Sequence, residues 1–388
     1  MKQVRNVTVD YFYRFFSSFD LVGSIWILFL GYREMSLFEI GILEGIFHLT
    51  SIIFEVPTGA IADLFGRKRT LIIGRLAGAL SAILMLVGGH FIVYLVAMVT
   101  ASASYNFNSG SEEALVYDSL LETGQEEKYL KINGKLYFLM QSGAAVGALL
   151  GGYISEYSFE LVYGLNVLAR LFACVVALFY KEVESKNKGE ELEKVTVKSH
   201  FSLALKVLKE NPRVGRLSAF YAGISTVVCT IMFYSQEYFA TLGMRNFYIA
   251  TLGFIGGFVA AFGALLANKV HVRMKSKAIR VLCVFVGIAC MGMVVPIYPA
   301  AVIGFLCLLY CDAIVECIVS NQLNAMIPSA QRATLLSVQS MLFSIGMIVI
   351  FPLCGLLMTY IKMGYVFAGL GVVTVFITLL SRNLITEK

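Results

Sequence analysis

The chain has 388 residues, of which 58% are hydrophobic and only 14% carry a charge. Soluble domains contain about 45–50% apolar residues, and about a quarter of their residues are charged. This composition therefore excludes a water-soluble globule and indicates a protein that lies in lipid. The net charge of +6 follows from lysines and arginines gathered in loops between apolar runs. It requires no nucleic-acid partner.

Metal, redox and common hydrolytic chemistry lack their usual residues. The eight cysteines all lie in apolar runs and form no C-x-x-C pair, so they are typical of small core residues. The sequence contains no H-E-x-x-H, no G-x-S-x-G and no P-loop motif, which are the usual marks of zinc hydrolysis, serine hydrolysis and ATP-driven motion. We therefore expect neither an enzyme nor a metal or organic cofactor.

Apolar runs long enough to cross a membrane follow one another along the chain. A spanning helix needs about 20 mostly apolar residues. A β-barrel would instead show segments of about ten residues with alternating polarity, and these runs lack that alternation. The sequence predicts an all-α membrane protein with twelve transmembrane helices, at 11–30, 37–61, 70–88, 91–115, 134–155, 160–180, 217–239, 247–267, 279–297, 300–322, 334–358 and 363–381.

The distribution of lysine and arginine predicts the orientation of these spans. Most of them lie in segments that fall on one side of the membrane, which places both termini in the cytoplasm by the positive-inside rule. The N-terminus lacks the short apolar region and cleavage site of a secretory signal, so we expect the first span to be retained.

A hydrophilic stretch near the midpoint divides the spans into two groups of six. We predict an N-terminal six-helix bundle over 1–180, a cytoplasmic linker over 181–216 and a C-terminal six-helix bundle over 217–388. Phe201, Leu205 and Leu208 recur at helical spacing beside lysines. The linker therefore forms either an amphipathic helix on the inner leaflet or a solvated tether. Two pseudo-symmetric bundles are one plan of secondary transporters, whose substrate site lies near the midplane.

The loop after the second span carries a specific motif. It reads Gly59-Ala60-Ile61-Ala62-Asp63-Leu64-Phe65-Gly66-Arg67-Lys68-Arg69-Thr70-Leu71. The glycines permit a tight reversal, and the basic residues favour the cytoplasmic face. The loop resembles the G-x-x-x-D-x-x-G-R-K-x-x-L loop of the major facilitator superfamily. That resemblance implies a gating role for Gly59, Asp63, Gly66, Arg67 and Lys68. The alternative is a positive-inside turn with no switching task.

The segment that leads into this loop carries a further resemblance. It reads Glu55-Val56-Pro57-Thr58-Gly59 and resembles a variant found in bacterial tetracycline and multidrug exporters.

The fifth span carries a second pattern of the same family. It consists of Gly134, Gly143, Gly147, Gly151 and Gly152. This spacing resembles the antiporter motif of drug-efflux members, although Ala148 stands where the family places proline. The resemblance implies export; the alternative is close helix packing through small residues. In the fourth span Asn106 stands where drug antiporters often carry an arginine, which leaves that residue's proton-coupling role unfilled.

Ionisable side chains within the spans are candidates for proton coupling and for lining a substrate cavity. Each costs roughly 2.5–3.5 kcal/mol at the bilayer centre on insertion scales, so each requires a partner, water or a function. Asp20 and Glu44 are the first choice for a proton carrier. The alternative is that the acids are held in structural pairs with Arg170, Arg75 or His48. The full set of candidates is Asp20, Glu44, His48, Glu55, Glu113, Asp312 and Glu316.

Three acids, Glu112, Glu113 and Asp118, lie close to the inner surface. For these we expect interfacial solvation or pairing with the loop arginines. Through such pairing, Asp118 would join the gating loop.

These observations predict a monomeric multi-pass transporter in the cytoplasmic membrane of a bacterium. We expect it to export small amphipathic compounds against protons by alternating access, with the proton gradient as its energy source and no cofactor. Its partners are then the small-molecule substrate, protons and lipid. The alternatives are a permease that imports or exports a single metabolite and a non-transporting membrane sensor.

Overall fold

The computed structural model describes residues 5–109, 111–183, 209, 211–327 and 332–381. At residues 56, 59–60, 62–64, 276 and 332–334 it describes the backbone alone. The linker residues Phe201, Leu205 and Leu208, on which an amphipathic helix was predicted, lie outside the described part.

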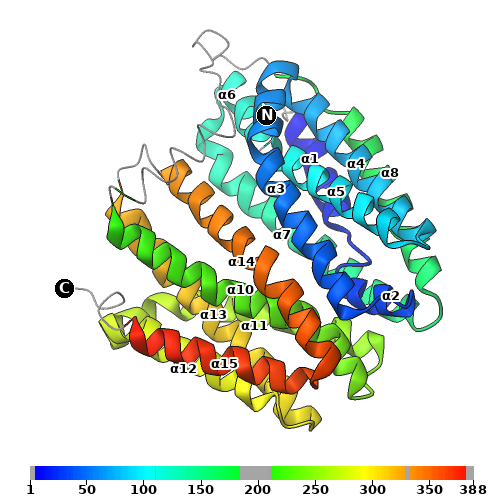
Figure 1. Ribbon diagram of the computed structural model, residues 1–388. Helices are drawn as coiled ribbons and strands as arrows, with labels where there is room; N and C mark the ends of the chain where they lie inside the picture. Colours follow the sequence, from blue (N-terminus) through cyan, green and yellow to red (C-terminus); the bar gives the residue numbers. More distant parts are fainter. Residues whose placement is uncertain (1–4, 110, 184–208, 210, 328–331, 382–388) are drawn as a thin grey trace. The chain divides into compact units, whose positions relative to one another are not determined.

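Every regular element in the described part is a helix (Figure 1). Ten helical segments there are long and apolar enough to cross a membrane. The prediction of an all-helical membrane protein is therefore confirmed, whereas the number of twelve spans and the side of the termini stay predictions. The longer elements are α1 (Arg5–Ser18), α2 (Trp26–Tyr32), α3 (Leu37–Phe65), α4 (Arg67–Val87), α5 (Phe91–Asn108), α6 (Ser111–Glu122), α7 (Tyr129–Ser155), α8 (Phe159–Leu178), α10 (Pro212–Thr241), α11 (Asn246–Met274), α12 (Ala278–Gly292), α13 (Tyr298–Met326), α14 (Arg332–Tyr360) and α15 (Met363–Leu380).

The first predicted span is wrong in one respect: it is not a single helix. α1 ends at Ser18 and α2 begins only at Trp26, so the predicted helix over 11–30 is interrupted. Two amides in the interruption bind side chains. Leu21 N donates to Asn166 Oδ1 at 3.3 Å, and Val22 N donates to Asp20 Oδ1 at 3.3 Å. In a continuous helix these amides would bind carbonyls four residues earlier. Side-chain acceptors therefore replace the helical ladder here.

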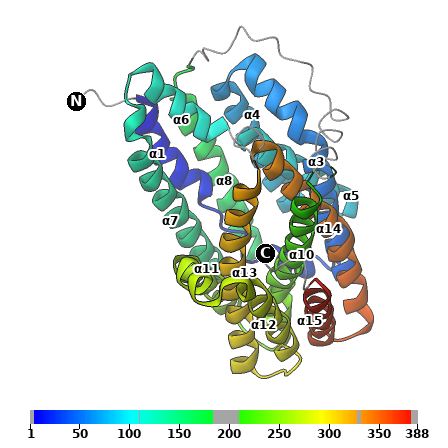
Figure 2. The same cartoon turned by 90° about the vertical axis from the view of Figure 1, so that its left-hand side faces the viewer.

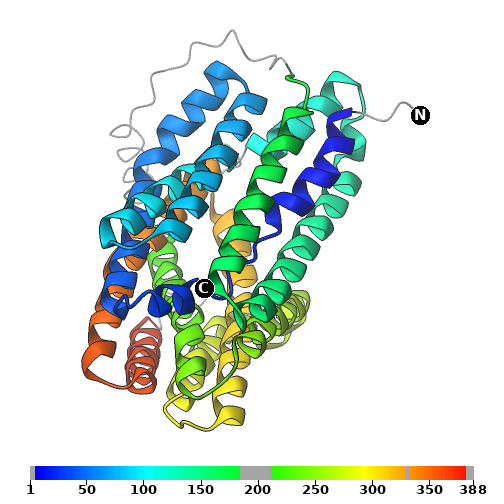
Figure 3. The same ribbon diagram turned by 90° about the vertical axis from the view of Figure 1, so that its right-hand side faces the viewer.

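The chain divides into two compact units, Met1–Trp26 with Ile46–Ser199 and Ile27–Gly45 with His200–Lys388. In the first unit α1 runs alongside α7 and also contacts α8, while α4 packs against α5 and α8 (Figures 2 and 3). One buried cluster joins α1, α4, α6 and the end of α8 through Tyr13, Leu71, Leu115 and Ala177. The apolar core of this unit thus lies where the candidate site is built.

In the second unit α13 contacts α10, α11 and α12, and α15 packs along α12 (Figure 1). Small residues permit the closest approaches. A Cβ atom added to Gly287 of α12 would lie 2.7 Å from the carbonyl oxygen of Gly371 in α15. Without a strong hydrophobic force between helices in lipid, such close backbone packing is a main source of their association.

Candidate functional site

The turn between α3 and α4 follows from Gly66. Its φ of 91° lies in the left-handed region that favours glycine. A Cβ atom at this position would lie 2.6 Å from Cδ of Glu182. The same carboxylate accepts a hydrogen bond from Lys68 N at 3.2 Å. The second glycine of the loop motif therefore lets the chain reverse directly against an acidic side chain.

The loop motif also supplies an ion pair. Arg67 Nε, in the first turn of α4, lies 3.0 Å from Asp118 Oδ2 of α6. Both side chains are about one quarter exposed. This contact agrees with the expectation that Asp118 pairs with a loop arginine. Gly59 and Asp63 are described by their backbone alone, so the gating role of the loop stays a prediction. Variants of the Arg67–Asp118 pair can test it.

Reversing the Arg67–Asp118 pair provides that test. Partly exposed ion pairs stabilise proteins by only about 0.2–1 kcal/mol, so Asp118→Arg should leave the folded protein abundant. If the pair is a gate, Asp118→Arg should lower transport severalfold, and the double variant Arg67→Asp/Asp118→Arg should restore most of it. Uptake of a transported dye into membrane vesicles measures transport by the single and the double variant. A Lys68→Gln variant controls for loss of loop charge. Equal transport in all four proteins would show that the loop is only a turn.

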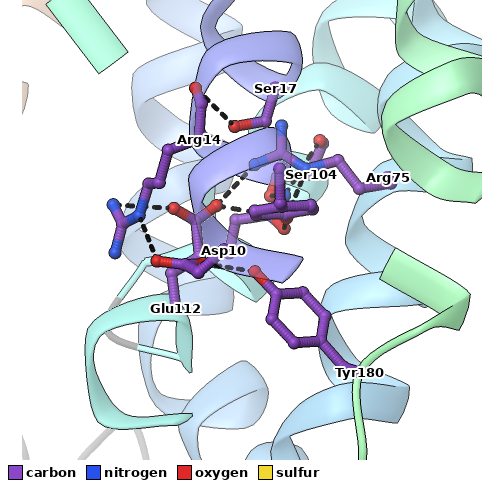
Figure 4. Close-up of polar contacts among 9 residues, drawn as sticks. Asp10, Arg14, Ser17, Arg75, Ser104, Glu112 and Tyr180 are labelled. Atoms are coloured by element: carbon purple, nitrogen blue, oxygen red, sulfur yellow. Dashed lines mark hydrogen bonds and ion pairs between the residues drawn. The ribbon is translucent and has the colours of Figure 1, made fainter. Parts of the chain in front are cut away.

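A buried network of charges lies between α1, α4 and α6 (Figure 4). Glu112 is its centre. It lies 2.9 Å from Arg14 Nη1 and 2.5 Å from Arg75 Nη2, with side-chain exposures of 9–14% for the three residues. Arg14 Nε also lies 3.3 Å from Asp10 Oδ2, and the hydroxyl of Tyr180 donates to the other oxygen of Asp10. Two acids and two arginines are thus brought together, which balances their charges within the network.

Aromatic and amide groups complete this network. Arg75 Nε donates to the Tyr13 hydroxyl at 2.6 Å, and its guanidinium carbon lies 4.9 Å from the centre of the Tyr13 ring. The Tyr13 hydroxyl in turn lies 3.2 Å from Glu112 Oε1 and 3.3 Å from Asn108 Oδ1. Buried charges are tolerated only when they are paired and hydrogen-bonded. These contacts therefore favour a structural role for the cluster.

The sequence placed Glu112 near the inner surface, solvated or paired with a loop arginine. The structure buries it instead against Arg14 and Arg75, because α1, α4 and α6 meet at this point. Asp10 and Arg14 were not among the candidates. Their sequence spacing could have identified them, because they carry opposite charges one helical turn apart at the start of the first span.

Three glycines of the fifth span pack against the backbone of the interrupted first span. A Cβ atom on Gly147 of α7 would lie 2.7 Å from Asp20 N, and one on Gly151 would overlap the carbonyl oxygen of Leu21. Gly143 meets the carbonyl of Phe15 in the same way, and Gly152 is buried. Gly134 has no atom within 4 Å of its added Cβ. The glycine face therefore lets the irregular backbone at Asp20 lie directly on α7.

Asp20, a first choice for the proton carrier, lies within this interruption. Its Oδ1 atom lies 3.4 Å from Nη2 of Arg170 in α8. The partner comes from another helix, so the sequence of span 1 alone gave no sign of it. This geometry agrees with the alternative interpretation, in which Arg170 neutralises the acid.

The other candidates are spread over α3, α6 and α13. Glu44 and His48 are buried in α3, Glu55 is half-buried, and Glu113 and Glu316 are exposed. Asp312 is half-buried, yet its Oδ1 atom is inaccessible and has no hydrogen-bond partner in the described part of the chain. Asn106, at the position where drug antiporters often have arginine, donates to Ser51 Oγ at 3.0 Å. It joins α5 to α3 without a charge.

A helical protein with spanning-length helices in two units, buried ion pairs and a basic loop between α3 and α4 is a multi-pass membrane protein. The family model described as Major Facilitator Superfamily matches residues 11–330, and the chain belongs to this family. The family predicted from the loop motif is thereby confirmed. Membership in this family identifies the chain as a transporter.

Curated relatives are distant. The chain is 23% identical over 337 residues to YxaM of Bacillus subtilis, described as an uncharacterized MFS-type transporter, with 84% of this chain and 82% of that one covered. It is 25% identical to Multidrug resistance protein 2 of B. subtilis over 49% of this chain and 47% of the relative. The Quinolone resistance protein NorA of Staphylococcus aureus matches at 24% identity over 39% of this chain and 38% of the relative. The last two matches cover less than half of each relative.

Solved structures share the fold. The nucleoside transporter NupG superposes with a TM-score of 0.76 at 13% identity and covers all of both chains. A bacterial homologue of the human lysosomal transporter Spinster has a TM-score of 0.71 at 15% identity, over 99% of this chain and 97% of that one. At such low identity these likenesses establish the fold alone.

Proposed function

We propose that this protein is a proton-coupled exporter of small amphipathic compounds that works by alternating access in the cytoplasmic membrane. Family membership makes it a transporter. The multidrug resistance and quinolone resistance relatives support export of drug-like compounds. The protein would act as a monomer, and its energy would come from the proton gradient without a cofactor.

The buried environment of the Asp312 carboxylate is the observation that supports proton coupling. One of its oxygens is buried without a hydrogen bond in the described part of the chain, and no ion pair described there includes it. Within the second unit its electrostatic neighbours include Glu316 and Cys311 of α13, Tyr221 and Cys229 of α10 and Cys283 of α12, and none of these is a cation. A buried carboxylate without a cation is stabilised by taking up a proton. Asp312 is therefore a better candidate for the proton carrier than Asp20, which has Arg170.

Replacing Asp312 with asparagine tests the coupling. The amide keeps the size of the side chain and removes its titration, so Asp312→Asn should reduce proton-driven dye export at least tenfold while exchange of dye between equal pools continues. Purified protein in liposomes with an imposed pH gradient is the assay, and Glu122→Gln at the exposed end of α6 serves as control. Export by Asp312→Asn at the wild-type rate, or export unaffected by a protonophore, would rule out this coupling. Flux of a single metabolite would favour a specific permease, and no flux of any solute would favour a sensor.

A further inference from the structure

The interruption of the first span places an ion pair beside the middle of α8, a helix long and apolar enough to cross a membrane. Arg170 lies near the middle of α8, and Asp20 lies between α1 and α2. The side chain of Arg170 is 29% exposed and that of Asp20 is 39% exposed. Charged side chains at this depth face the protein interior or a water-filled cavity and avoid lipid. The exposed side of this pair therefore faces water, which places it within reach of a solute.

This pair is among the looser arginine pairs of the same unit. Its shortest nitrogen–oxygen distance is 3.4 Å, similar to the 3.3 Å between Arg14 and Asp10 and longer than the 3.0 Å between Arg67 and Asp118. The two arginine contacts of Glu112 are shorter, at 2.9 and 2.5 Å. Strong charge-assisted hydrogen bonds measure about 2.7–2.9 Å. A guanidinium has five N–H donors, and within the described residues Asp20 alone forms an ion pair with Arg170. Arg170 therefore has donors to which another carboxylate can bind, and that carboxylate would compete with Asp20 for the guanidinium.

A second donor without an acceptor lies one helical turn away. Asn166 precedes Arg170 by four residues on α8, so the two share a helix face. Asn166 is 1% exposed and its Oδ1 atom accepts from Leu21 N, but its Nδ2 atom has no partner in the described part of the chain. A buried donor left unsatisfied destabilises the folded protein. An acceptor that enters beside the interruption would remove that destabilisation.

The two side chains together define the chemistry of the group they would bind. Arg170 offers a planar fork that matches the two oxygens of a carboxylate. Asn166 adds a neutral amide donor beside it. The rings of Phe16 and Phe172, 4.6 Å apart between centroids, provide apolar surface where α1 meets α8. The arrangement therefore suits an amphipathic compound that carries a carboxylate.

We infer that Arg170 is the residue that recognises the solute, and that it binds the carboxylate of an amphipathic anion or zwitterion in place of Asp20. The inference rests on the proposed transport function and adds the substrate class to it. Asp20 and the solute compete for the same guanidinium. Removing the charge of Asp20 should therefore strengthen binding of the solute, whereas removing Arg170 should weaken it.

Binding of two matched probes tests this inference. The probes are a quinolone carboxylic acid and its ethyl ester, which differ only in the anionic group, and equilibrium dialysis against the full chain in lipid nanodiscs measures their affinities. Wild type should bind the acid at least about tenfold more tightly than the ester, since a charge-assisted hydrogen bond stabilises by about 1.5–3 kcal/mol. Arg170→Gln should bind the acid and the ester equally, and Asp20→Asn should bind the acid severalfold more tightly than wild type. Arg170→Lys, which keeps the charge but loses the fork, should fall between Arg170→Gln and wild type.

Controls separate recognition from folding and from transport. Lys362→Gln removes one exposed positive charge before α15 and should bind both probes as wild type does. The gain expected for Asp20→Asn does not depend on whether Arg170→Gln folds. The inference is overturned if wild type does not distinguish acid from ester, or if Asp20→Asn binds the acid no better. If the acid binds through Arg170 but no flux occurs in liposomes, the transport proposal fails and the recognition site stands.

Discussion

Replacing Glu112 with glutamine is expected to remove most of the folded protein from the membrane. Glu112 balances two buried arginines, Arg14 and Arg75. Glutamine would leave Arg75 without an acidic partner and Arg14 with Asp10 alone. Removing one partner of a buried pair costs about 3–5 kcal/mol. Since folded proteins are stable by about 5–15 kcal/mol, this is a large share. Fluorescence-detected size exclusion should show lower expression before heating. The same measurement on heated samples should give a markedly lower Tm.

The adjacent residue is a matched control for this prediction. Glu113 has the same side chain on the same helix but is exposed, so Glu113→Gln should change the Tm by less than a degree or two. The double variant Glu112→Gln/Arg75→Gln should recover part of the loss, because it removes the cation that Glu112→Gln leaves without an acidic partner, while Arg14 keeps Asp10. A Glu112→Gln protein as stable as wild type would show that the cluster in Figure 4 does not hold α1, α4 and α6 together.

Replacing Gly151 with alanine is expected to destabilise the protein, whereas the same change at Gly134 should stabilise it slightly. Alanine favours a helix over glycine by about 1 kcal/mol, and Gly134 has open space for the added methyl group. At Gly151 that methyl group would overlap the carbonyl of Leu21. Overpacking of this kind costs about 1–3 kcal/mol. The two Tm shifts should therefore have opposite signs.

Transport assays extend the comparison of the two glycines. The backbone from Asp20 to Leu21 would have to move away from α7 in Gly151→Ala, which would break the contact between Leu21 N and Asn166 and distort the site around Arg170. Gly151→Ala should therefore lose most of its transport, and Gly134→Ala should keep it. Loss of transport in both variants at equal stability would favour a direct export role for the whole glycine pattern over helix packing.

Long apolar runs were the most predictable feature of the fold. The predicted span at 160–180 corresponds to α8 (Phe159–Leu178), and that at 363–381 corresponds to α15 (Met363–Leu380). Such agreement arises because a backbone in lipid must satisfy its hydrogen bonds within each segment. The interruption of the first span was not predictable in this way. Its amides at Leu21 and Val22 are satisfied by side chains, one of which belongs to α8.

The sequence by itself determined that the protein is a helical membrane transporter with a basic reversal at Gly66 and a glycine face on the fifth span. Hydropathy, charge and the space that glycine leaves are properties of single segments and can be read along the chain. Only the tertiary structure decided which acids are neutralised. Glu112 meets two arginines from α1 and α4, Asp20 meets Arg170 of α8, and Asp312 keeps a buried oxygen without a partner among the described residues. Ionic partners are set by which helices touch and how each is rotated, and uniformly apolar spans do not encode that rotation.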